Sequence, residues 1–442
     1  MATDPVAPMR AREFRPRLLA WPSWRLASSL GFCIWLGTRL GMAMLTYATM
    51  IFVAPLGHAD APLQPRGAQV MTLLSHWLNW DSGWYVGIAM RGYDWSGVKN
   101  PFVFDPLQAT SFFPLYPFLV RELAEGLRHL PTPAYGNLVA YPFGISALIV
   151  SNLSALVAFV AVAALALQEG YGRNRVQLTL LLLAAYPLAF YLAAGYSEAP
   201  MLAASALTLL FARRGQWVGT GVAAALAALT RGPGVLILVP VAWEYGRQHG
   251  WWSLSEWRTV PIGRRVRDLA VALPVLFAAP LGTLVYAGYL WRRFGDPLLF
   301  LESEHWWRRH LAPPWEVVRM VVQALHHAPP TVGGRGWQIV ILLNCSVLLS
   351  FIVITIVSAR SLPASFTLYS AGVILLGAVT VSTADPDPLT SAGRYLVPAF
   401  PVFLGLANLV RNRSGLRVGL VSGGFFLQCS FIAVWLSGNF VD

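Results

Sequence analysis

One acidic side chain in this sequence stands among aromatic residues, in the stretch HWLNWDSGWY at positions 76–85. Three tryptophans, a tyrosine and a histidine accompany Asp81 there, which is too aromatic for an ordinary solvent loop and too polar for a bilayer core. A carboxylate shielded from bulk water can take the proton of a hydroxyl group. The alternative is a structural acid in the first turn of a helix, stabilised by the helix dipole with Asn79 near the cap. The spacing alone leaves both interpretations open.

Two arginines border apolar runs at positions where an anion could bind. Arg231 lies in LTRGPG, and Arg394 lies beside Tyr395 in GRYLVP. A guanidinium group binds phosphate through two parallel hydrogen bonds, and the Gly-Pro-Gly after Arg231 breaks a helix and can present backbone amides to an anion. The alternative for both arginines is a membrane-interface anchor whose charge reaches toward water.

A third group of candidates lies in SEHWWRRH, residues 303–310. Aromatic faces stack on sugar rings, and histidine or arginine side chains can hold a phosphate. We therefore expect His305, Trp307 and Arg308 to contribute to a binding site. The acids and histidines of this region do not follow the H-E-x-x-H spacing of a zinc site, so the sequence predicts no dedicated metal site.

Two further charged stretches stand beside apolar runs. Glu198 lies in GYSEAP, and a charge at that depth marks a functional site or an ion pair that holds the bundle together. Arg39 and Arg231 are the candidate partners for such a pair. The stretch ADPDP at 384–388 places two acids between prolines, which excludes a helix and predicts a rigid exposed turn.

The elements that must position these residues are membrane helices. The chain has 442 residues, of which 56% are hydrophobic and 12% charged, whereas a soluble protein carries about a quarter charged residues. Apolar runs long enough to cross a bilayer recur from end to end. We therefore predict an all-α polytopic membrane protein that forms a single domain over residues 1–442. The eleven predicted spans are 27–55, 138–167, 177–194, 196–212, 216–230, 232–246, 268–292, 337–358, 363–382, 395–410 and 416–438.

The basic residues set the predicted orientation. In the N-terminal segment 1–26 and the turns on the same side, basic side chains outnumber acidic ones roughly threefold, whereas the other side carries nearly equal numbers. The net charge of +12 therefore orients the protein against anionic lipid and does not indicate a nucleic-acid partner. The predicted outer segments are 56–137, 293–336 and 383–394. Within the first, the stretches 70–92 and 112–130 have the apolar spacing of amphipathic helices.

The stretches NWDSGWYVGIAMRGY and SFFPLYPFLVREL resemble the first external loop of GT-C glycosyltransferases. The similarity is closest to the PIG-V-like family of integral-membrane mannosyltransferases, which includes the second mannosyltransferase of GPI-anchor synthesis. It continues, in the same order along nearly the whole chain, in AGYSEAPML, ALTRGPGVLIL, FGDPLLF and GRYLVPAFPVF. Residues 95–108 are an insert that the resemblance does not place.

The resemblance implies a GT-C-type bundle that transfers a hexose, mannose above all, with inversion from a polyprenyl-phosphate donor to a lipid or glycan acceptor. An external-loop aspartate is the proposed general base of such enzymes, and Asp81 occupies the matching position. The residues expected to bind the donor phosphate and sugar are Arg231, His305, Trp307, Arg308, Arg394 and Tyr395. The residues expected to support the site are Trp80, Trp84, Tyr85, Tyr196 and Glu198.

No cofactor is expected, although a divalent cation held by Asp81 with Asp94 or Asp105 stays open. We expect an integral protein of a bacterial cytoplasmic membrane with its site on the outer face. Two other functions remain. A transporter or lipid flippase predicts two related halves with interrupted spans and ionisable residues near the midplane. A non-catalytic assembly subunit would not require the cluster around Asp81.

Overall fold

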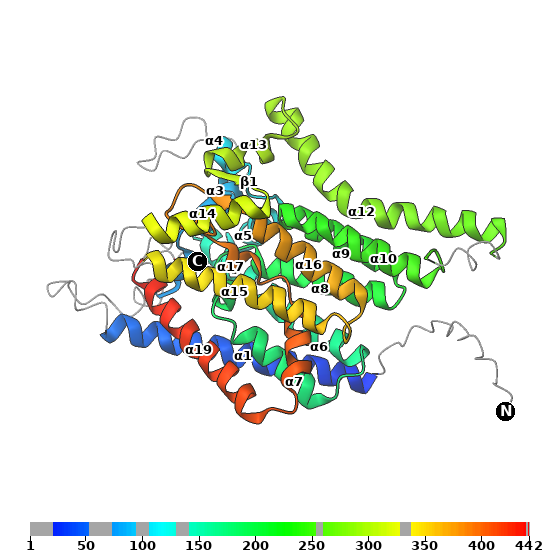
Figure 1. Cartoon of the computed structure of the whole chain (residues 1–442). Helices are drawn as coiled ribbons and strands as arrows, with labels where there is room; N and C mark the ends of the chain where they lie inside the picture. The colour runs from blue at the N-terminus through cyan, green and yellow to red at the C-terminus, as the bar shows by residue number, and fades with distance from the viewer. Residues whose placement is uncertain are drawn as a thin grey trace.

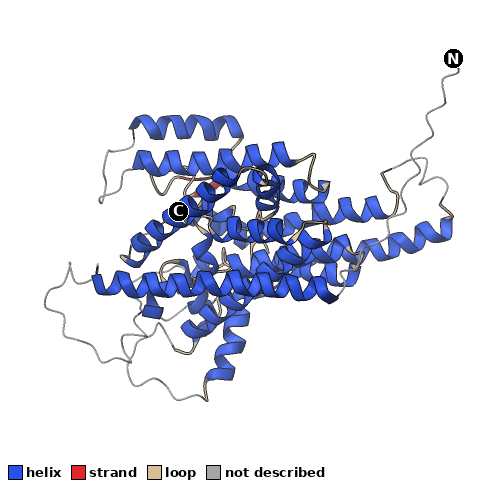
Figure 2. Cartoon of the chain, turned by 90° about the horizontal axis from the view of Figure 1, so that it is seen from below, coloured by secondary structure: helices blue, strands red, loops and turns tan. Residues whose placement is uncertain are grey.

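The computed structural model describes residues 21–52, 73–93, 106–129, 141–252, 260–327, 337–438 and 441. These residues are almost entirely helical (Figures 1 and 2), which confirms the predicted all-α class. The elements up to the middle of the chain are α1 (Trp21–Phe52), η2 (His76–Leu78), α3 (Asp81–Arg91), α4 (Pro106–Ala109), α5 (Leu115–Leu127), α6 (Phe143–Gln168), α7 (Arg173–Ala184), η3 (Ala189–Leu192), α8 (Glu198–Arg213), α9 (Trp217–Thr230), η4 (Gly232–Ile237) and α10 (Leu238–Gln248). Those that follow are α12 (Ile262–Phe294), α13 (Leu299–Trp306), β1 (Arg309–Leu311), α14 (Pro314–His327), α15 (Trp337–Ser358), α16 (Ala364–Val379), β2 (Thr380–Ser382), α17 (Ala392–Tyr395), α18 (Pro401–Val410) and α19 (Ser414–Leu436).

Five of the described helices are long and apolar enough to cross a membrane, namely α1, α6, α12, α15 and α19. Three shorter apolar helices, α9, α16 and α18, accompany them. Because a bilayer core of about 30 Å needs about 20 helical residues, the five long helices alone make this a multi-pass membrane protein. The predicted number of eleven spans stays a prediction.

The predicted span 177–194 is wrong as a single helix. The helix α7 ends at Ala184, and a turn leads into the short η3 before α8 begins at Glu198. Pro187 lies in this turn; it has no backbone N–H and disfavours helical geometry in the residue before it. Apart from the half-buried Pro187, the broken segment is buried, and it delivers Tyr196 and Glu198 to the interior.

Small residues let the central helices approach closely. The helices α6, α8, α9 and α12 pack against one another, and α8 and α9 are rich in alanine. A Cβ atom on Gly282 of α12 would lie 2.7 Å from the Ala225 carbonyl oxygen of α9, so only glycine permits this crossing. Close packing of small side chains is the usual way in which helices associate within lipid.

The three predicted outer segments meet at one end of the bundle. The hydroxyl groups of Ser111 and Ser303 lie 2.6 Å apart and join the first segment to α13. The strand β1 of the second segment pairs antiparallel with β2, with Arg309 opposite Ser382. The Thr383 amide at the start of the third segment donates to the Arg308 carbonyl oxygen (2.9 Å). The predicted amphipathic helices are present as α3 and α5, which pack on each other and on α6.

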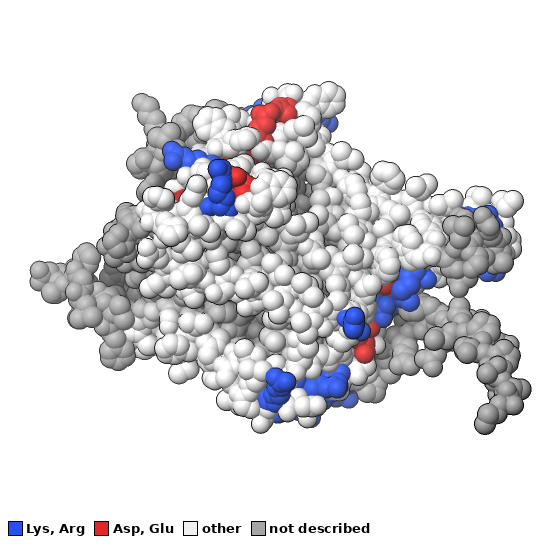
Figure 3. Space-filling view, in the orientation of Figure 1, with Lys and Arg blue, Asp and Glu red and all other residues white. Residues whose placement is uncertain are grey.

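The opposite end is held by an ion-pair cluster between helix ends. Arg213 at the end of α8 contacts Glu169 after α6 (2.7 Å) and Glu244 of α10 (3.2 Å), and Glu244 also pairs with Arg247. On the face shown in Figure 3, the charged side chains gather toward two ends of the molecule, and the surface between them is uncharged. Such a band is the surface that hydrocarbon chains solvate.

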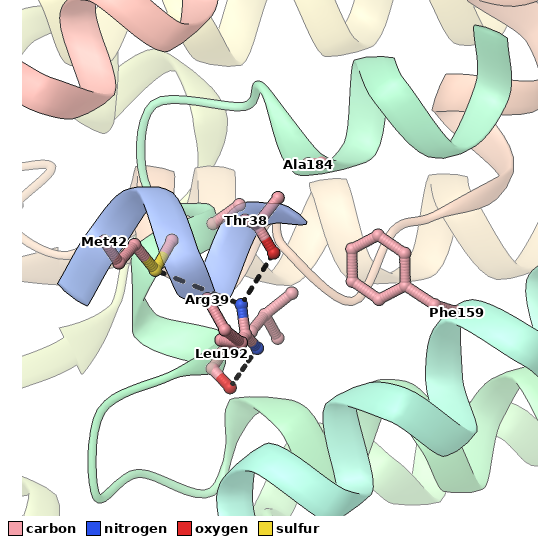
Figure 4. Close-up of a pocket in the computed structure, with 7 residues that line it drawn as sticks. Thr38, Arg39, Met42, Phe159, Ala184 and Leu192 are labelled. Carbon is pink, nitrogen blue, oxygen red and sulfur yellow. Dashed lines mark hydrogen bonds between the residues drawn. The ribbon is translucent and has the colours of Figure 1, made fainter. Parts of the chain in front are cut away.

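Arg39 lies near the middle of α1, and it holds the broken segment before α8. Its Nη2 donates to the Leu192 carbonyl oxygen (3.0 Å) and its Nη1 to Thr38 (3.2 Å), as Figure 4 shows. Its Nε donates to Asn152 Oδ1 (2.6 Å). The gap beside it has no space for a water molecule, and no carboxylate of the described residues pairs with it. The guanidinium therefore satisfies a carbonyl group that the helix break leaves free.

Replacing Arg213 should destabilise the fold. Arg213→Met keeps the volume but leaves Glu169 and the buried Glu244 side by side without their shared cation. We expect the free energy of unfolding to fall by about 3 kcal/mol, as in other broken buried pairs. Unfolding in mixed detergent micelles measures it. Arg319→Met, which breaks an exposed ion pair on α14, is the control and should change the free energy of unfolding little. Equal effects of the two variants would contradict the role of the cluster.

Candidate active site

The backbone around Asp81 turns sharply before α3. Trp80 has a positive φ (57°) with ψ −118°, a backbone conformation that is unusual for a bulky residue and must be held by its surroundings. The Tyr196 hydroxyl group donates to the Asn79 carbonyl oxygen (3.1 Å) and accepts from the Asp81 amide (3.1 Å). Asp81 lies in the first turn of α3, as the structural alternative has it, and Asn79 precedes the cap residue Trp80. The Asn79 side chain donates to the Trp435 carbonyl oxygen (3.5 Å).

Asp81 forms an ion pair with Arg394, which comes from the other end of the sequence. Arg394 Nη1 donates to Asp81 Oδ2 at 2.7 Å, and the arginine side chain is 2% exposed. The Asp81 side chain keeps 22% of its surface exposed. Among the described residues its second oxygen, Oδ1, has no hydrogen-bond partner. The carboxylate is therefore oriented through one oxygen and open through the other.

Glu198 extends this pair into a chain of alternating charges. It is fully buried, and its Oε1 lies 3.3 Å from Arg394 Nε and also pairs with Arg231. The order Arg231, Glu198, Arg394, Asp81 therefore alternates positive and negative charge. Of the two partners considered for Glu198, Arg231 is the one that the structure brings to it, and Arg39 is not. In the low dielectric of the interior such alternation offsets the cost of burying each charge.

Three arginines surround the ring of Tyr395. The guanidinium carbons of Arg231, Arg394 and Arg309 lie 5.0, 5.3 and 5.5 Å from the ring centroid. Arg309 also donates to the Tyr395 hydroxyl group. Because two of these arginines already pair with Glu198 and Asp81, Arg309 is the member of the described set without a carboxylate partner. The cluster carries one positive charge in excess of its ion pairs.

A cavity of about 790 Å³ opens onto this cluster. Its polar lining comes from Asp81, Arg231, Glu304, His305, Arg309, His310 and Arg394. Its aromatic lining includes Tyr85, Phe112 and Trp307, and the Phe112 ring packs against Tyr85 at 5.0 Å and Trp307 at 5.9 Å. An apolar wall, formed by Val235 and Leu236 of η4 with Val373 and Leu376 of α16, completes it. The cavity thus combines an anion-binding end with an apolar side.

Helix breaks place two of the three arginines that line the cavity. Thr230 ends α9 and Gly232 starts η4, and Arg231 between them has an extended backbone. A Cβ atom on Gly234 would lie 2.0 Å from the Ala227 carbonyl oxygen, which makes this glycine obligatory. The short helix α17 that carries Arg394 follows Ser391, which is left-handed (φ 69°).

The structure brings most of the predicted site residues together. Seven line the cavity, namely Asp81, Tyr85, Arg231, His305, Trp307, Arg394 and Tyr395. Glu198, Tyr196 and Trp84 are buried behind them, in contact with the lining residues. Trp80 is predicted to support the site, but its side chain is 47% exposed and does not line the cavity. Its contribution is therefore limited to the backbone turn before Asp81. Burial raises the pKa of the Tyr85 phenol, which keeps this hydroxyl group protonated beside Ser197.

Arg308 is the predicted binding residue that the structure places elsewhere. It adopts a left-handed conformation (φ 52°), and its exposed side chain does not line the cavity. The neighbouring Arg309 points inward in its place. Arg309 begins β1 and Arg308 precedes it, so the choice between them depends on where α13 ends, and the sequence does not mark that point.

The stretch 384–388 is only partly the exposed turn that the sequence predicts. Asp385 is exposed, but Asp387 is fully buried and accepts hydrogen bonds from Asn344 Nδ2 (2.7 Å) and from the Leu389 amide (2.9 Å). Burial raises the pKa of the Asp387 carboxyl group. This contact ties the loop before Arg394 to α15.

Within the described residues, no group of three or more acidic, histidine or cysteine side chains has the arrangement of a metal site. Asp94 and Asp105, the acids considered with Asp81 for a cation, lie outside the described residues.

Comparisons of the chain with protein-family models, curated proteins and solved structures found no match. The functional argument therefore depends on the geometry of the site.

The Tyr196 hydroxyl group should be required for the turn that carries Asp81. Tyr196→Phe leaves the partly buried Asp81 amide and Asn79 carbonyl without this partner. We expect the free energy of unfolding to fall by about 1–2 kcal/mol. The same change at Tyr47, which is 59% exposed on α1, is the control. Equal stabilities of the two variants would show that the bridge does not hold the turn.

Proposed function

We propose that this protein is an inverting glycosyltransferase that moves a hexose, mannose by family resemblance, from a polyprenyl-phosphate carrier to a hydroxyl group of a lipid or glycan acceptor. The observation that carries the proposal is one cavity in which the open oxygen of Asp81 faces the same space as three arginines. Hydroxyl activation and phosphate departure need these two functions side by side.

The charge of the site fits a phosphodiester. The three arginines around Tyr395 have two carboxylate partners, Asp81 and Glu198, so one positive charge remains for a ligand. A sugar linked to a lipid phosphate carries one negative charge. Guanidinium groups bind phosphate oxygens through charge-assisted hydrogen bonds, which gives both affinity and orientation.

The apolar wall fits the other half of such a donor. Val235, Leu236, Val373 and Leu376 lie on η4 and α16, beside the long apolar helix α12. A polyprenyl chain needs an apolar path from the membrane to the reacting phosphate. A soluble nucleotide sugar would have no use for this wall, so we prefer the lipid-linked donor.

The reaction follows as a single displacement. Asp81 Oδ1 accepts the proton of the acceptor hydroxyl group while its oxygen attacks the anomeric carbon. The bond between that carbon and the phosphate oxygen breaks, and the phosphate leaves with a second negative charge. Arg231 and Arg309 stabilise this growing charge. Arg394 orients Asp81 through Oδ2 and thereby holds the base in position.

The lipid carrier and the charge distribution together favour the outer face of a bacterial cytoplasmic membrane. The three outer segments meet around the cavity, and the basic cluster around Arg213 lies between helix ends on the predicted inner side. Positive charge stays on the cytoplasmic side of membrane proteins.

Asp81→Asn should abolish transfer in a folded protein. Asparagine keeps the size and can still accept from Arg394, but it cannot take a proton, and general-base catalysis contributes about 10²–10⁴-fold. The measurement is transfer of labelled sugar from synthetic polyprenyl-phosphate-mannose by the purified protein. Asp385→Asn, on an exposed neighbouring acid, is the control. A turnover within a few-fold of wild type would exclude Asp81 as the base.

Arg309→Ala should weaken donor use, whereas Arg308→Ala should not. The two residues are adjacent, but Arg309 lines the cavity and Arg308 is exposed outside it. A lost charge-assisted phosphate contact costs about 1.5–3 kcal/mol, so the KM for the donor should rise by about ten- to a hundredfold. Steady-state kinetics of the two variants measures the donor KM of each. An unchanged donor KM in Arg309→Ala would remove Arg309 from the phosphate site.

A further inference from the structure

The cavity contains a second carboxyl group that the reaction described above does not use. Glu304 lies on α13, and its half-buried side chain lines the cavity. No hydrogen bond or ion pair joins it to any described residue. Unlike Asp81 and Glu198, it therefore forms no ion pair.

Basic groups surround Glu304 without contacting it. Arg309 and Arg231 act on it electrostatically, and His305 and His310 line the same cavity. Of the elements packed on α13, α4 has no titratable side chain, and α12 ends with Arg292 and Arg293. Burial raises the pKa of the Glu304 carboxyl group, and the two arginines offset this only in part.

The charge balance of the cavity depends on the protonation state of Glu304. Arg231 and Arg394 are paired with Glu198 and Asp81, so Arg309 supplies the one positive charge in excess. An ionised Glu304 would cancel that charge and repel an anion. A neutral Glu304 leaves the charge in place and adds an O–H donor.

We propose that Glu304 binds the donor as a neutral carboxylic acid, with its O–H donating a hydrogen bond to the phosphate that Arg231 and Arg309 hold. This inference rests on the proposed function, because it takes the ligand of the cavity to be a phosphodiester. Its consequence is that donor binding is coupled to proton uptake by the protein. As pH rises, Glu304 loses its proton in the free protein, and the affinity for the phosphodiester falls.

Glu304→Gln tests this directly. Glutamine has nearly the same shape and keeps an N–H donor, but it cannot ionise. The probe is a water-soluble dialkyl phosphate, which keeps one negative charge across the whole pH range and so does not titrate itself. Calorimetry of the purified full-length protein in detergent, in two buffers of different ionisation enthalpy, gives both the affinity and the protons taken up per ligand bound.

We expect the two proteins to bind alike at low pH, where Glu304 is neutral in the free protein. As the pH rises, the wild type should lose affinity relative to Glu304→Gln, by up to about tenfold per pH unit once Glu304 is ionised in the free protein. Proton uptake should be smaller in Glu304→Gln. His305 and His310 line the same cavity, but both proteins retain them, so the difference isolates Glu304. Glu302→Gln, an exposed acid of the same helix, should behave as wild type.

Parallel pH profiles of wild type and Glu304→Gln would overturn the proposal, as would weaker binding by Glu304→Gln at every pH with unchanged thermal stability. Failure of the proposed function gives a different result. In that case none of the proteins binds the dialkyl phosphate, or Arg309→Ala binds it as tightly as wild type does.

Discussion

The buried charge chain from Arg231 through Glu198 and Arg394 to Asp81 is the constraint on which the site depends. Its four members come from regions far apart in the sequence, and two of them, Glu198 and Arg394, are almost completely excluded from solvent. A charge left alone in such a place would cost several kcal/mol. The chain therefore forms only when α3, α8, α9 and α17 are all in place, which couples the geometry of the site to the completeness of the fold.

Breaks in regular structure deliver these charges to one place. Arg231 follows the end of α9, Glu198 starts α8 after the turn at Pro187, Arg394 lies in one short turn, and Asp81 follows the strained Trp80. Helix ends free backbone groups, and in an apolar setting each needs a partner. Tyr196 and Arg39 supply such partners by binding the Asn79 and Leu192 carbonyl oxygens. The polar side chains behind the cavity thus support it by satisfying backbone groups.

The sequence predicted the features that depend on composition and local chemistry. Apolar runs identified the helices, and aromatic and glycine-rich contexts identified Asp81, Arg231 and Arg394 as the candidates that the structure then places around one cavity. Features set by tertiary contacts were not predictable. Arg309 faces the cavity and Arg308 does not, and this difference depends on the last turn of α13. The burial of Asp387 depends on Asn344 from a distant helix. The partner of Glu198 could not be chosen because two arginines had equally suitable positions along the chain.

The central claim is that this cavity joins a sugar to an acceptor hydroxyl group. It is tested most directly by incubating the purified protein in liposomes with polyprenyl-phosphate-mannose, labelled in the sugar, and a membrane lipid extract as the source of acceptor. The account predicts that label leaves the carrier and appears in a new glycosidic bond of inverted anomeric configuration. Label that stays on the carrier and merely moves to the other leaflet would contradict the account and identify a flippase.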